Sequence, residues 1–368
     1  MKKHHMNKKL LPLLLSFIIV TKTFASINLS DLTLDQKIGQ LFMVAAVADE
    51  EIARECIAKK SYRLDKEYIE ELIKDYYIGG IIFLGKSEIE KQKERTKHFQ
   101  NIAKIPLLIG QDLEPGRVGK SRLDSFNYPS NQEIGVIDNQ NYTFALAKEI
   151  GAFCASLGVH INFAPVADIN SNPDNPIIND RSFGTTAEPV TYQCLAFMTG
   201  LNEKGIISCA KHFPGHGDTI NDSHKTLPYL KHNRNRLDEV ELFPFKKLIE
   251  YNIPAIMIGH IAIPALDDQN IPASLSKKIV TDLLRKEFGF NGLIITDALD
   301  MVAVTKDYHH GNAELHALLA GNDILLCPMD VPKAIIKIKK ALADDLIIEK
   351  EIDAHVERIL HVKNQIFI

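Results

Sequence analysis

Short apolar runs recur along the whole chain, and they predict alternating strands and helices. Each run is almost continuously apolar, as a parallel strand covered on both faces should be. The eight runs span residues 41–47, 80–85, 106–112, 160–167, 206–212, 255–260, 293–297 and 323–327. Between them, apolar residues spaced three and four apart, for example over 68–76, 145–154 and 280–288, are typical of amphipathic helices.

The number of strand–helix repeats favours a closed barrel over an open doubly wound sheet. A last helix is predicted from residue 349 to about 362, and no Pro-, Gly- or Ser-rich linker divides the chain. A chain of 368 residues has room for two domains, but barrels with insertions reach this length as well. We therefore expect one α/β domain, a (β/α)8 TIM-type barrel, over residues 26–368.

Residues 1–25 differ from the rest of the chain and resemble a secretory signal peptide. Four lysines precede an apolar run over residues 10–20, which is short for a membrane span. Thr23 and Ala25 then supply the small residues that a signal peptidase accepts. We predict cleavage near Ala25, export to the periplasm or cell envelope, and no stable membrane span afterwards; the alternative is an uncleaved N-terminal anchor.

Charge and cysteine pattern narrow the range of partners. Lys and Arg number 43 against 47 Asp and Glu, a net charge of −4, and no long basic run follows the N-terminus, so nucleic acid is not expected as a partner. The five cysteines are far apart and include no C-x-x-C pair, which predicts buried free thiols and no zinc pattern. We expect a monomer without a cofactor.

Ionisable residues gather at the ends of the predicted strands. In a barrel of this type the chemistry lies at the C-terminal ends of the strands. Five of the eight runs end in such groups, where burial without partners would be costly. They are Asp112, Asp168, Lys211 with His212, His260 and Asp297. Solvation of the strand ends is the alternative explanation, but five such ends favour a functional site.

The richest segment is residues 211–224, which reads KHFPGHGDTINDSH. Its Pro and Gly residues prevent a helix, so the segment is predicted to be a loop that leaves a strand. Three His, two Asp and one Lys suggest metal ligation or acid/base chemistry. A zinc pair at His212 and His216 would need a helix, so no metal site is predicted here. His216 and Asp218 have an equally good explanation as residues that bond the loop to itself.

Two further patterns suggest catalytic groups. Asp222 can accept the ring N–H of His224 two residues later, which would make the histidine a general acid/base; an Asx turn with a bystander His is the alternative. Asp297, at the mouth of an apolar strand, is placed as a nucleophile or base, whereas Asp300 suits a helix N-terminus.

Two other segments, 112–120 and 175–184, are interpreted as binding loops. Within the second, Arg181 could hold ligand oxygens in its fork, and a surface salt bridge is the alternative.

These segments together resemble family 3 glycoside hydrolases that act as β-N-acetylglucosaminidases. The loop 211–224, followed by Leu227-Pro228, is similar to the catalytic loop of that family. The other family motifs follow in order from about residue 32 to the C-terminus: DLEPGRV at 112–118, FAPVAD at 163–168, DRSFG at 180–184 and ITDALDM at 295–301.

The resemblance implies roles for particular residues. It implies Asp297 as nucleophile, His224 as acid/base and Asp222 as the partner of His224. It also implies that the sugar is bound by Asp112, Lys120, Arg181, Lys211, His212 and Met301. Two departures from the family pattern are Pro115, where a Gly is common, and Lys120, where an Arg commonly contacts substrate and a bidentate fork is lost.

The activity implied is retaining hydrolysis of terminal β-linked N-acetylglucosamine, most plausibly from peptidoglycan fragments, by a short single-barrel member of the family. Attack by the substrate's acetamido oxygen is the mechanistic alternative. β-Glucosidase or phosphorylase activity within the family, a catalytically inactive barrel that binds cell-wall sugar, and a Schiff-base aldolase that uses Lys211 are the alternative functions.

Overall fold

The computed structural model describes residues 26–52, 63–117 and 127–367. Its centre is one sheet of eight parallel strands in the order β7-β6-β5-β4-β3-β2-β1-β8. Every run that was predicted as a strand contains one. The strands are β1 (Phe42–Val47), β2 (Gly80–Leu84), β3 (Leu108–Gln111), β4 (Ile161–Asn162), β5 (Ile207–Phe213), β6 (Ala255–Ile258), β7 (Leu293–Thr296) and β8 (Leu325–Leu326).

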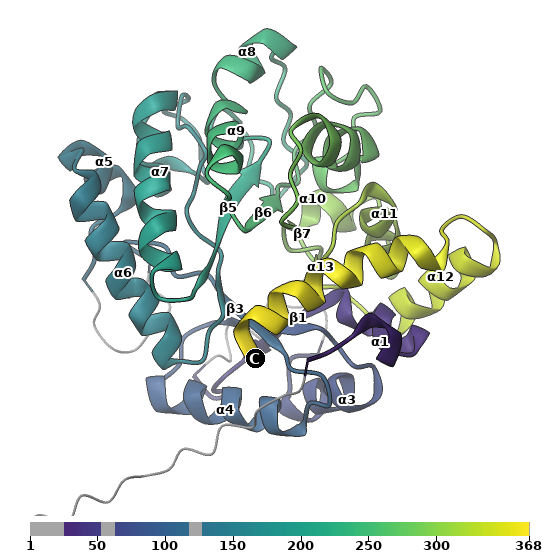
Figure 1. Ribbon diagram of the computed structural model, residues 1–368. Coiled ribbons are helices and arrows are strands. Elements are labelled where there is room, and N and C mark those ends of the chain that lie inside the picture. The colour runs from purple at the N-terminus through teal and green to yellow at the C-terminus, as the bar shows by residue number, and fades with distance from the viewer. Residues whose placement is uncertain (1–25, 53–62, 118–126, 368) are drawn as a thin grey trace, which may run out of the picture.

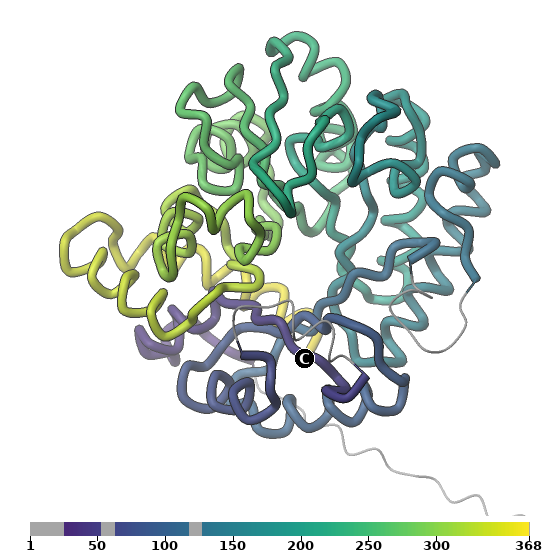
Figure 2. Tube along the Cα trace, turned by 180° about the vertical axis from the view of Figure 1, so that it is seen from behind, coloured from purple at the N-terminus to yellow at the C-terminus, as the bar shows by residue number. Residues whose placement is uncertain are grey.

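The sheet curves round until its two ends meet. β8 pairs with β1 in the register Phe42 to Leu325, and a parallel bridge joins Ile295 of β7 to Ile324 just before β8. Figures 1 and 2 show the helices surrounding the strands. The predicted barrel is therefore confirmed. Among the described residues, no helix is both long and apolar enough to cross a bilayer.

Helices follow most of the strands, as the apolar spacing predicted, and several begin at side-chain caps. Thr33 and Ser130 form capping boxes, which satisfy N–H groups that the first helical turn leaves open. The α-helices are α1 (Leu34–Gln40), α3 (Lys66–Asp75), α4 (Ile89–Ile102), α5 (Asn131–Ile137), α6 (Gln140–Ser156), α7 (Ala187–Asn202), α8 (Arg234–Glu239), α9 (Phe243–Glu250), α10 (Val302–Thr305), α11 (Asn312–Ala320), α12 (Val331–Ala343) and α13 (Glu349–Phe367).

The described residues also include four helical segments that are not α-helices. Three are 3-10 turns, η1 (Leu29–Asp31), η3 (Asn179–Arg181) and η4 (Ala273–Leu275). The fourth, η5 (Lys278–Glu287), covers the helix predicted over 280–288 but has π-helical hydrogen bonds.

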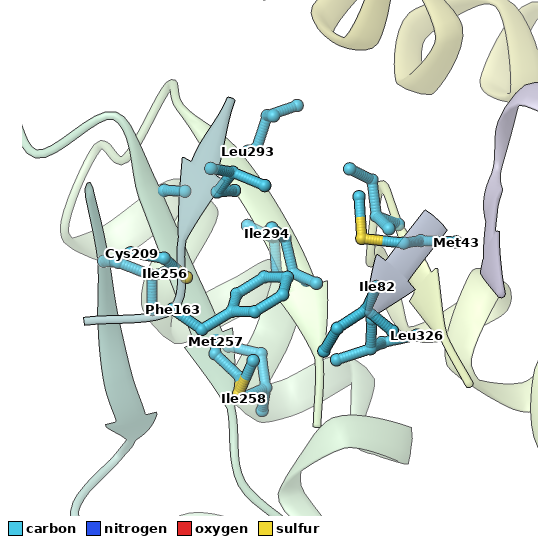
Figure 3. Packing of buried hydrophobic residues seen from close by; sticks show 14 of the residues in the cluster. Met43, Ile82, Phe163, Cys209, Ile256, Met257, Ile258, Leu293, Ile294 and Leu326 are labelled. Carbon is cyan, nitrogen blue, oxygen red and sulfur yellow. The ribbon is translucent and has the colours of Figure 1, made fainter. Parts of the chain in front are cut away.

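The barrel interior is filled by apolar side chains. All six residues of β1 are buried, in agreement with the continuous apolar pattern. Figure 3 shows Phe163, Met257 and Ile294 close together inside the barrel. Gly110 in β3 is required by this packing, because a Cβ there would lie 2.8 Å from the ring of Phe163. The interior is thus a packed core, and any ligand must bind at an end of the barrel.

The helix α13 (yellow in Figure 1) covers the N-terminal ends of the strands. Lys363 Nζ donates to Gln40 Oε1, just before β1, at 2.5 Å. The Phe367 ring lies 4.8 Å from that of His160, just before β4. Burial lowers the pKa of Lys363 to about 7. With this end closed, the C-terminal end remains for chemistry.

Three details of the sequence interpretation are changed or extended. β4 has only two residues, because the N–H of Ala164 turns back to Asn162 O at 2.8 Å and does not continue the ladder. Asp300 does not begin a helix: Met301 is the N-cap of α10, and Asp300 lies in the preceding turn. Cys194 and Cys209 are buried free thiols as predicted; Cys56 and the proposed signal peptide at 1–25 lie outside the described residues.

Candidate active site

A cavity of about 350 Å3 lies at the C-terminal ends of the strands and collects most of the predicted site residues. Its lining contains seven of the nine, namely Asp112, Arg181, Lys211, His212, His224, Asp297 and Met301. Asp222 contacts His224 just outside this lining. Lys120 lies outside the described residues. Residues far apart in the sequence are therefore brought to one pocket by the barrel.

Asp297 follows β7 directly and is held by backbone on both sides. Its N–H donates to Ile258 O at 2.8 Å, and its Oδ1 accepts from the N–H of Ala298 at 2.8 Å. Burial would raise the pKa of this carboxyl, but the neighbouring His212 and His260, the Ala298 N–H and Lys211 lower it to about 2. Asp297 is thus a fixed, ionised carboxylate facing the cavity.

Beside it, one buried carboxylate organises two cations. Glu114 accepts from Arg181 Nε at 3.0 Å and NH2 at 2.7 Å, and Lys211 Nζ lies 2.8 Å from the same carboxylate. Burial opposes ionisation of Glu114, yet Arg181 and Lys211 hold its pKa well below the usual range. The Arg181 fork is therefore not a surface salt bridge: it pairs with the buried Glu114, and Arg181 also lines the cavity, where its contact with sugar stays a prediction.

Lys211 completes this network from β5. Its Nζ donates to Asp112 Oδ1 at 2.6 Å. Burial lowers the pKa of Lys211, but the two carboxylates outweigh burial and raise it. An ammonium held in this way is a poor Schiff-base nucleophile, which argues against the aldolase alternative. Asp112 remains about half exposed and is the member of the network that can reach a sugar hydroxyl.

His212 is oriented by Asp168, which follows β4. Its Nδ1 lies 2.7 Å from Asp168 Oδ2, so Nε2 is the ring nitrogen left for a ligand in the cavity. Asp168 also accepts the N–H of His216 at 2.7 Å. Burial works against the ionised form of Asp168, but these partners lower its pKa. One carboxylate thus positions both ends of the segment 212–216.

His216 follows the structural explanation, whereas Asp218 pairs with a residue outside the loop. His216 Nδ1 lies 2.7 Å from Thr219 Oγ1 and Nε2 lies 3.1 Å from Ser223 Oγ, so both nitrogens bond the loop to itself. Burial lowers the pKa of His216 to about 4. Asp218 pairs with His232 and is not part of the cavity lining.

The pair Asp222 and His224 lies at the rim. His224 Nδ1 is 2.9 Å from Asp222 Oδ1, and the same oxygen accepts the backbone N–H of His224 at 2.8 Å. The Asx turn and the oriented imidazole are therefore both present. The His224 side chain is 59% exposed, whereas Asp222 is 17% exposed. This leaves Nε2 of His224 able to exchange a proton with a molecule in the cavity.

Two organising residues were missed as site residues, Glu114 and Asn175, and Asp168 was identified at a strand end but given no role. Asn175 Nδ2 donates to His216 O at 2.8 Å, which ties the predicted binding loop 175–184 to the loop 211–224. None of the three needs to touch a ligand. The signal that could have found Glu114 was a second carboxylate shortly after an apolar strand end, with cationic residues at neighbouring strand ends.

Comparison with known proteins gives a consistent result. Residues 33–362 match the family model described as "Glycosyl hydrolase family 3 N terminal domain". Beta-hexosaminidase A of Pseudoalteromonas piscicida is 34% identical over 329 residues, which are 81% of this chain but 55% of that protein. The chain therefore spans little more than half of that relative.

Solved structures agree with this match. A family 3 beta-N-acetylglucosaminidase from Paenibacillus sp. str. FPU-7 is similar with a TM-score of 0.82 and 34% identity, covering 91% of this chain and 63% of that one. The beta-glucoside phosphorylase BglX has a TM-score of 0.82 and 26% identity, covering 92% of this chain and 59% of that one.

Proposed function

Since the chain belongs to glycosyl hydrolase family 3, we propose that it is a retaining exo-β-N-acetylglucosaminidase that removes terminal β-linked N-acetylglucosamine from glycans. One observation carries the proposal. The ionised Asp297 lines the same cavity as His224, whose ring is oriented by Asp222. A glycosidase needs such a nucleophile and such a proton donor on one scissile bond.

Each step of the proposed reaction uses one of these groups. The Asp297 carboxylate attacks the anomeric carbon while protonated His224 gives its proton to the leaving glycosidic oxygen, which forms a glycosyl-Asp297 ester. Neutral His224 then takes a proton from water as the water oxygen attacks the same carbon. The ester bond breaks and Asp297 regains its carboxylate, so the sugar is released with its configuration retained.

The exposure of His224 adds a condition to this scheme. A proton donor must lie within hydrogen-bond distance of the leaving oxygen. With a side chain 59% exposed, His224 must be brought inward by sugar binding, through a shift of the segment that follows Thr219. Asp112, Lys211, His212 and Met301 would bind the sugar meanwhile, with Arg181 held by Glu114.

Substrate choice separates this activity from that of a β-glucosidase. We expect p-nitrophenol release from the β-N-acetylglucosaminide to exceed release from the β-glucoside by at least about 10²-fold in kcat/KM, because a site built to bind an acetamido group loses binding energy when the group is absent. Equal or reversed rates would overturn the assignment. Peptidoglycan fragments are the natural substrate that we propose to test next.

Phosphorolysis is the second candidate, and one observation favours it. The acid/base here is an imidazole, which lacks the negative charge by which a Glu would repel phosphate, and a β-glucoside phosphorylase shares the fold. Raised phosphate should then convert the glycosyl-enzyme to a sugar 1-phosphate, detectable by mass spectrometry.

We propose export to the periplasm or envelope on the basis of residues 1–25. Mass spectrometry of the protein from its own cells should find a mature N-terminus at Ser26. An intact Met1 on a cytosolic protein would contradict this.

A further inference from the structure

A second cluster of ionisable side chains lies beside the cavity and plays no part in the proposed reaction. It consists of Asp218, His232 and Glu241, each of which offers one potential ligand atom, and these atoms all lie within 4.8 Å of one another. Asp218 belongs to the loop 211–224, His232 precedes α8, and Glu241 lies between α8 and α9 (Figure 1). Three separate segments therefore converge here.

Glu241 shows that the cluster is incomplete as a hydrogen-bonded network. Its side chain is only 3% exposed, and its Oε1 accepts from Arg236 NH2 at 2.9 Å. Its Oε2 is buried and has no hydrogen-bond partner among the described residues. A buried acceptor without a donor destabilises the folded state, because it has lost its bonds to water without replacement. Burial raises the pKa of Glu241 despite Arg236, so the side chain is in a poor environment for a carboxylate.

The other two members supply the ligand types that complete a metal site. His232 Nε2 contacts Asp218 Oδ2, and these side chains are 31% and 22% exposed. A cavity of about 460 Å3, lined by both residues together with Asn221 and Tyr229, leads to them from the surface. The site thus has a route by which an ion can enter.

We propose that Asp218, His232 and Glu241 bind a divalent transition-metal ion, with zinc as the best match. One imidazole nitrogen and two carboxylate oxygens are a common zinc ligand set, and the fourth position would be filled by water. The imidazole disfavours magnesium and calcium, which select all-oxygen sites. Binding requires neutral His232, so any proton shared between His232 and Asp218 leaves to solvent as the ion enters. No metal site was predicted at His212 and His216. The site proposed here uses a different residue of the same loop, Asp218.

The ion would fasten the catalytic loop to the outer helices. Gly215 already packs against Glu241, since a Cβ at Gly215 would lie 2.8 Å from Glu241 Cβ. Asp222 and His224 follow Asp218 in the same loop. A metal bridge from Asp218 to Glu241 would therefore hold the stem of the segment that carries the acid/base, while leaving its tip free. The metal site itself does not depend on the proposed glycosidase activity.

Zinc binding by the full chain tests the proposal. The protein, without a histidine tag and after chelator treatment, is titrated with ZnCl2 by calorimetry. We expect one zinc ion per chain, bound at least about 10-fold more weakly by Glu241→Gln and by His232→Gln. His98→Gln is the matched control, because His98 Nε2 also faces a carboxylate, Glu70, at 2.7 Å, but outside the three-ligand cluster.

Three outcomes would overturn the proposal. They are no binding by the unaltered chain, equal binding by all variants, and loss of binding on His224→Gln but not on Glu241→Gln, which would place zinc at the catalytic pair. Zinc-edge anomalous scattering from crystals of the unaltered chain covers the case in which both variants fail to fold. A peak at His232 and Glu241 supports the site, and a peak elsewhere or none contradicts it.

Discussion

Asp297 is a partly buried carboxylate whose neighbours lower its pKa to about 2, so it is ionised at neutral pH, which is the state a nucleophile needs. Removing it should therefore remove turnover. We expect Asp297→Ala to lower kcat by at least about 10³-fold, since water cannot replace a positioned carboxylate at comparable effective concentration. The measurement is steady-state hydrolysis of the p-nitrophenyl N-acetylglucosaminide.

Azide and a fluorinated donor give this prediction its controls. Azide should restore cleavage by Asp297→Ala and yield the α-glycosyl azide, because azide then attacks the substrate directly with inversion. A 5-fluoro glycosyl donor should label Asp297 in the unaltered protein, as seen by peptide mapping. Either a label on Asp112 or a near-normal kcat in the variant would remove Asp297 from this role. Near-normal kcat without any labelled carboxylate would favour attack by the acetamido oxygen.

Substrates whose leaving groups differ in their need for a proton test the role of His224 as acid/base. Natural glycans leave only with a proton, whereas nitrophenolate leaves without one. His224→Ala should thus slow hydrolysis of chitobiose by about 10²-fold or more beyond its effect on cleavage of the activated aryl glycoside. Asp222→Ala should act in the same direction but less, because it orients the ring and does not exchange the proton. Equal losses on both substrates would mean that His224 only binds sugar.

For individual residues, the sequence predicted which side chains lie at the cavity, but not which of them hold the others in position. Asp297, His224 and Lys211 could be found because each ends or follows a recognisable run. The position of Glu114 between two cations could not, because contacts between strand ends depend on barrel curvature and side-chain rotamers that periodicity does not encode. For the same reason, the pairing of the Arg181 fork with Glu114 could not be predicted.

Among the elements, the loop 211–224 has little freedom where it leaves β5. Gly217 approaches the chain that follows β4 so closely that a Cβ there would lie 1.8 Å from Ile169 O. Gly217→Ala must therefore displace the loop, and we expect kcat/KM to fall by about 10²-fold, as for a catalytic group misplaced by about 1 Å.

Gly184→Ala is the matched control for that substitution. Gly184 lies in the predicted binding loop 175–184. The nearest atom to a Cβ added there would be Val190 Cγ2 at 3.7 Å, an ordinary contact. Activity should stay within about 3-fold of the unaltered protein, because nothing is displaced. If both variants lost activity equally, loop position would not be the cause.

The helices and strands were predictable to different degrees. Runs such as β1 are apolar throughout because both faces are covered, so their sequences identify them. Strand ends are less predictable, since they depend on hydrogen-bond partners: β4 stops at Asn162, where the N–H of Ala164 turns back to Asn162 O. The π-type hydrogen bonds of η5 leave no mark in an apolar spacing that suits an ordinary helix.

For the molecule as a whole, stability should fall in mildly acidic solution. Burial lowers the pKa of His160 and of His216 from 6.5 to about 4. Below pH 6.5 the unfolded chain therefore binds protons that the folded chain does not. The free energy of unfolding of the protein should therefore decrease by about 1–2 kcal/mol per histidine between pH 6.5 and 5.0. This pH range lies above the ordinary pKa of carboxyl groups, so the histidines account for the change.

Urea unfolding at pH 7.0, 6.0 and 5.0 measures this decrease. His160→Asn should remove the share of one histidine, since Asn Oδ1 can accept the Ile109 N–H that His160 Nδ1 now accepts at 3.0 Å. A stability that rises toward pH 5.0 would contradict the assignment of neutral, buried histidines.

The closed barrel was predictable from the count of strand–helix repeats, but closure itself depends on β8, which pairs with β1 and follows the bridge from Ile324 to Ile295 of β7. β1 pairs with β8 through Phe42 and Met43, whose partners are Leu325 and Leu326. This junction has a consequence for synthesis on the ribosome. One edge of β1 stays without its partner strand until β8, about 280 residues later, has been synthesised. At ordinary rates of translation this takes on the order of 15–60 s. An unpaired apolar edge is a template for aggregation during that interval. A chaperone that binds nascent chains should therefore act mainly on β1, the first strand to be synthesised.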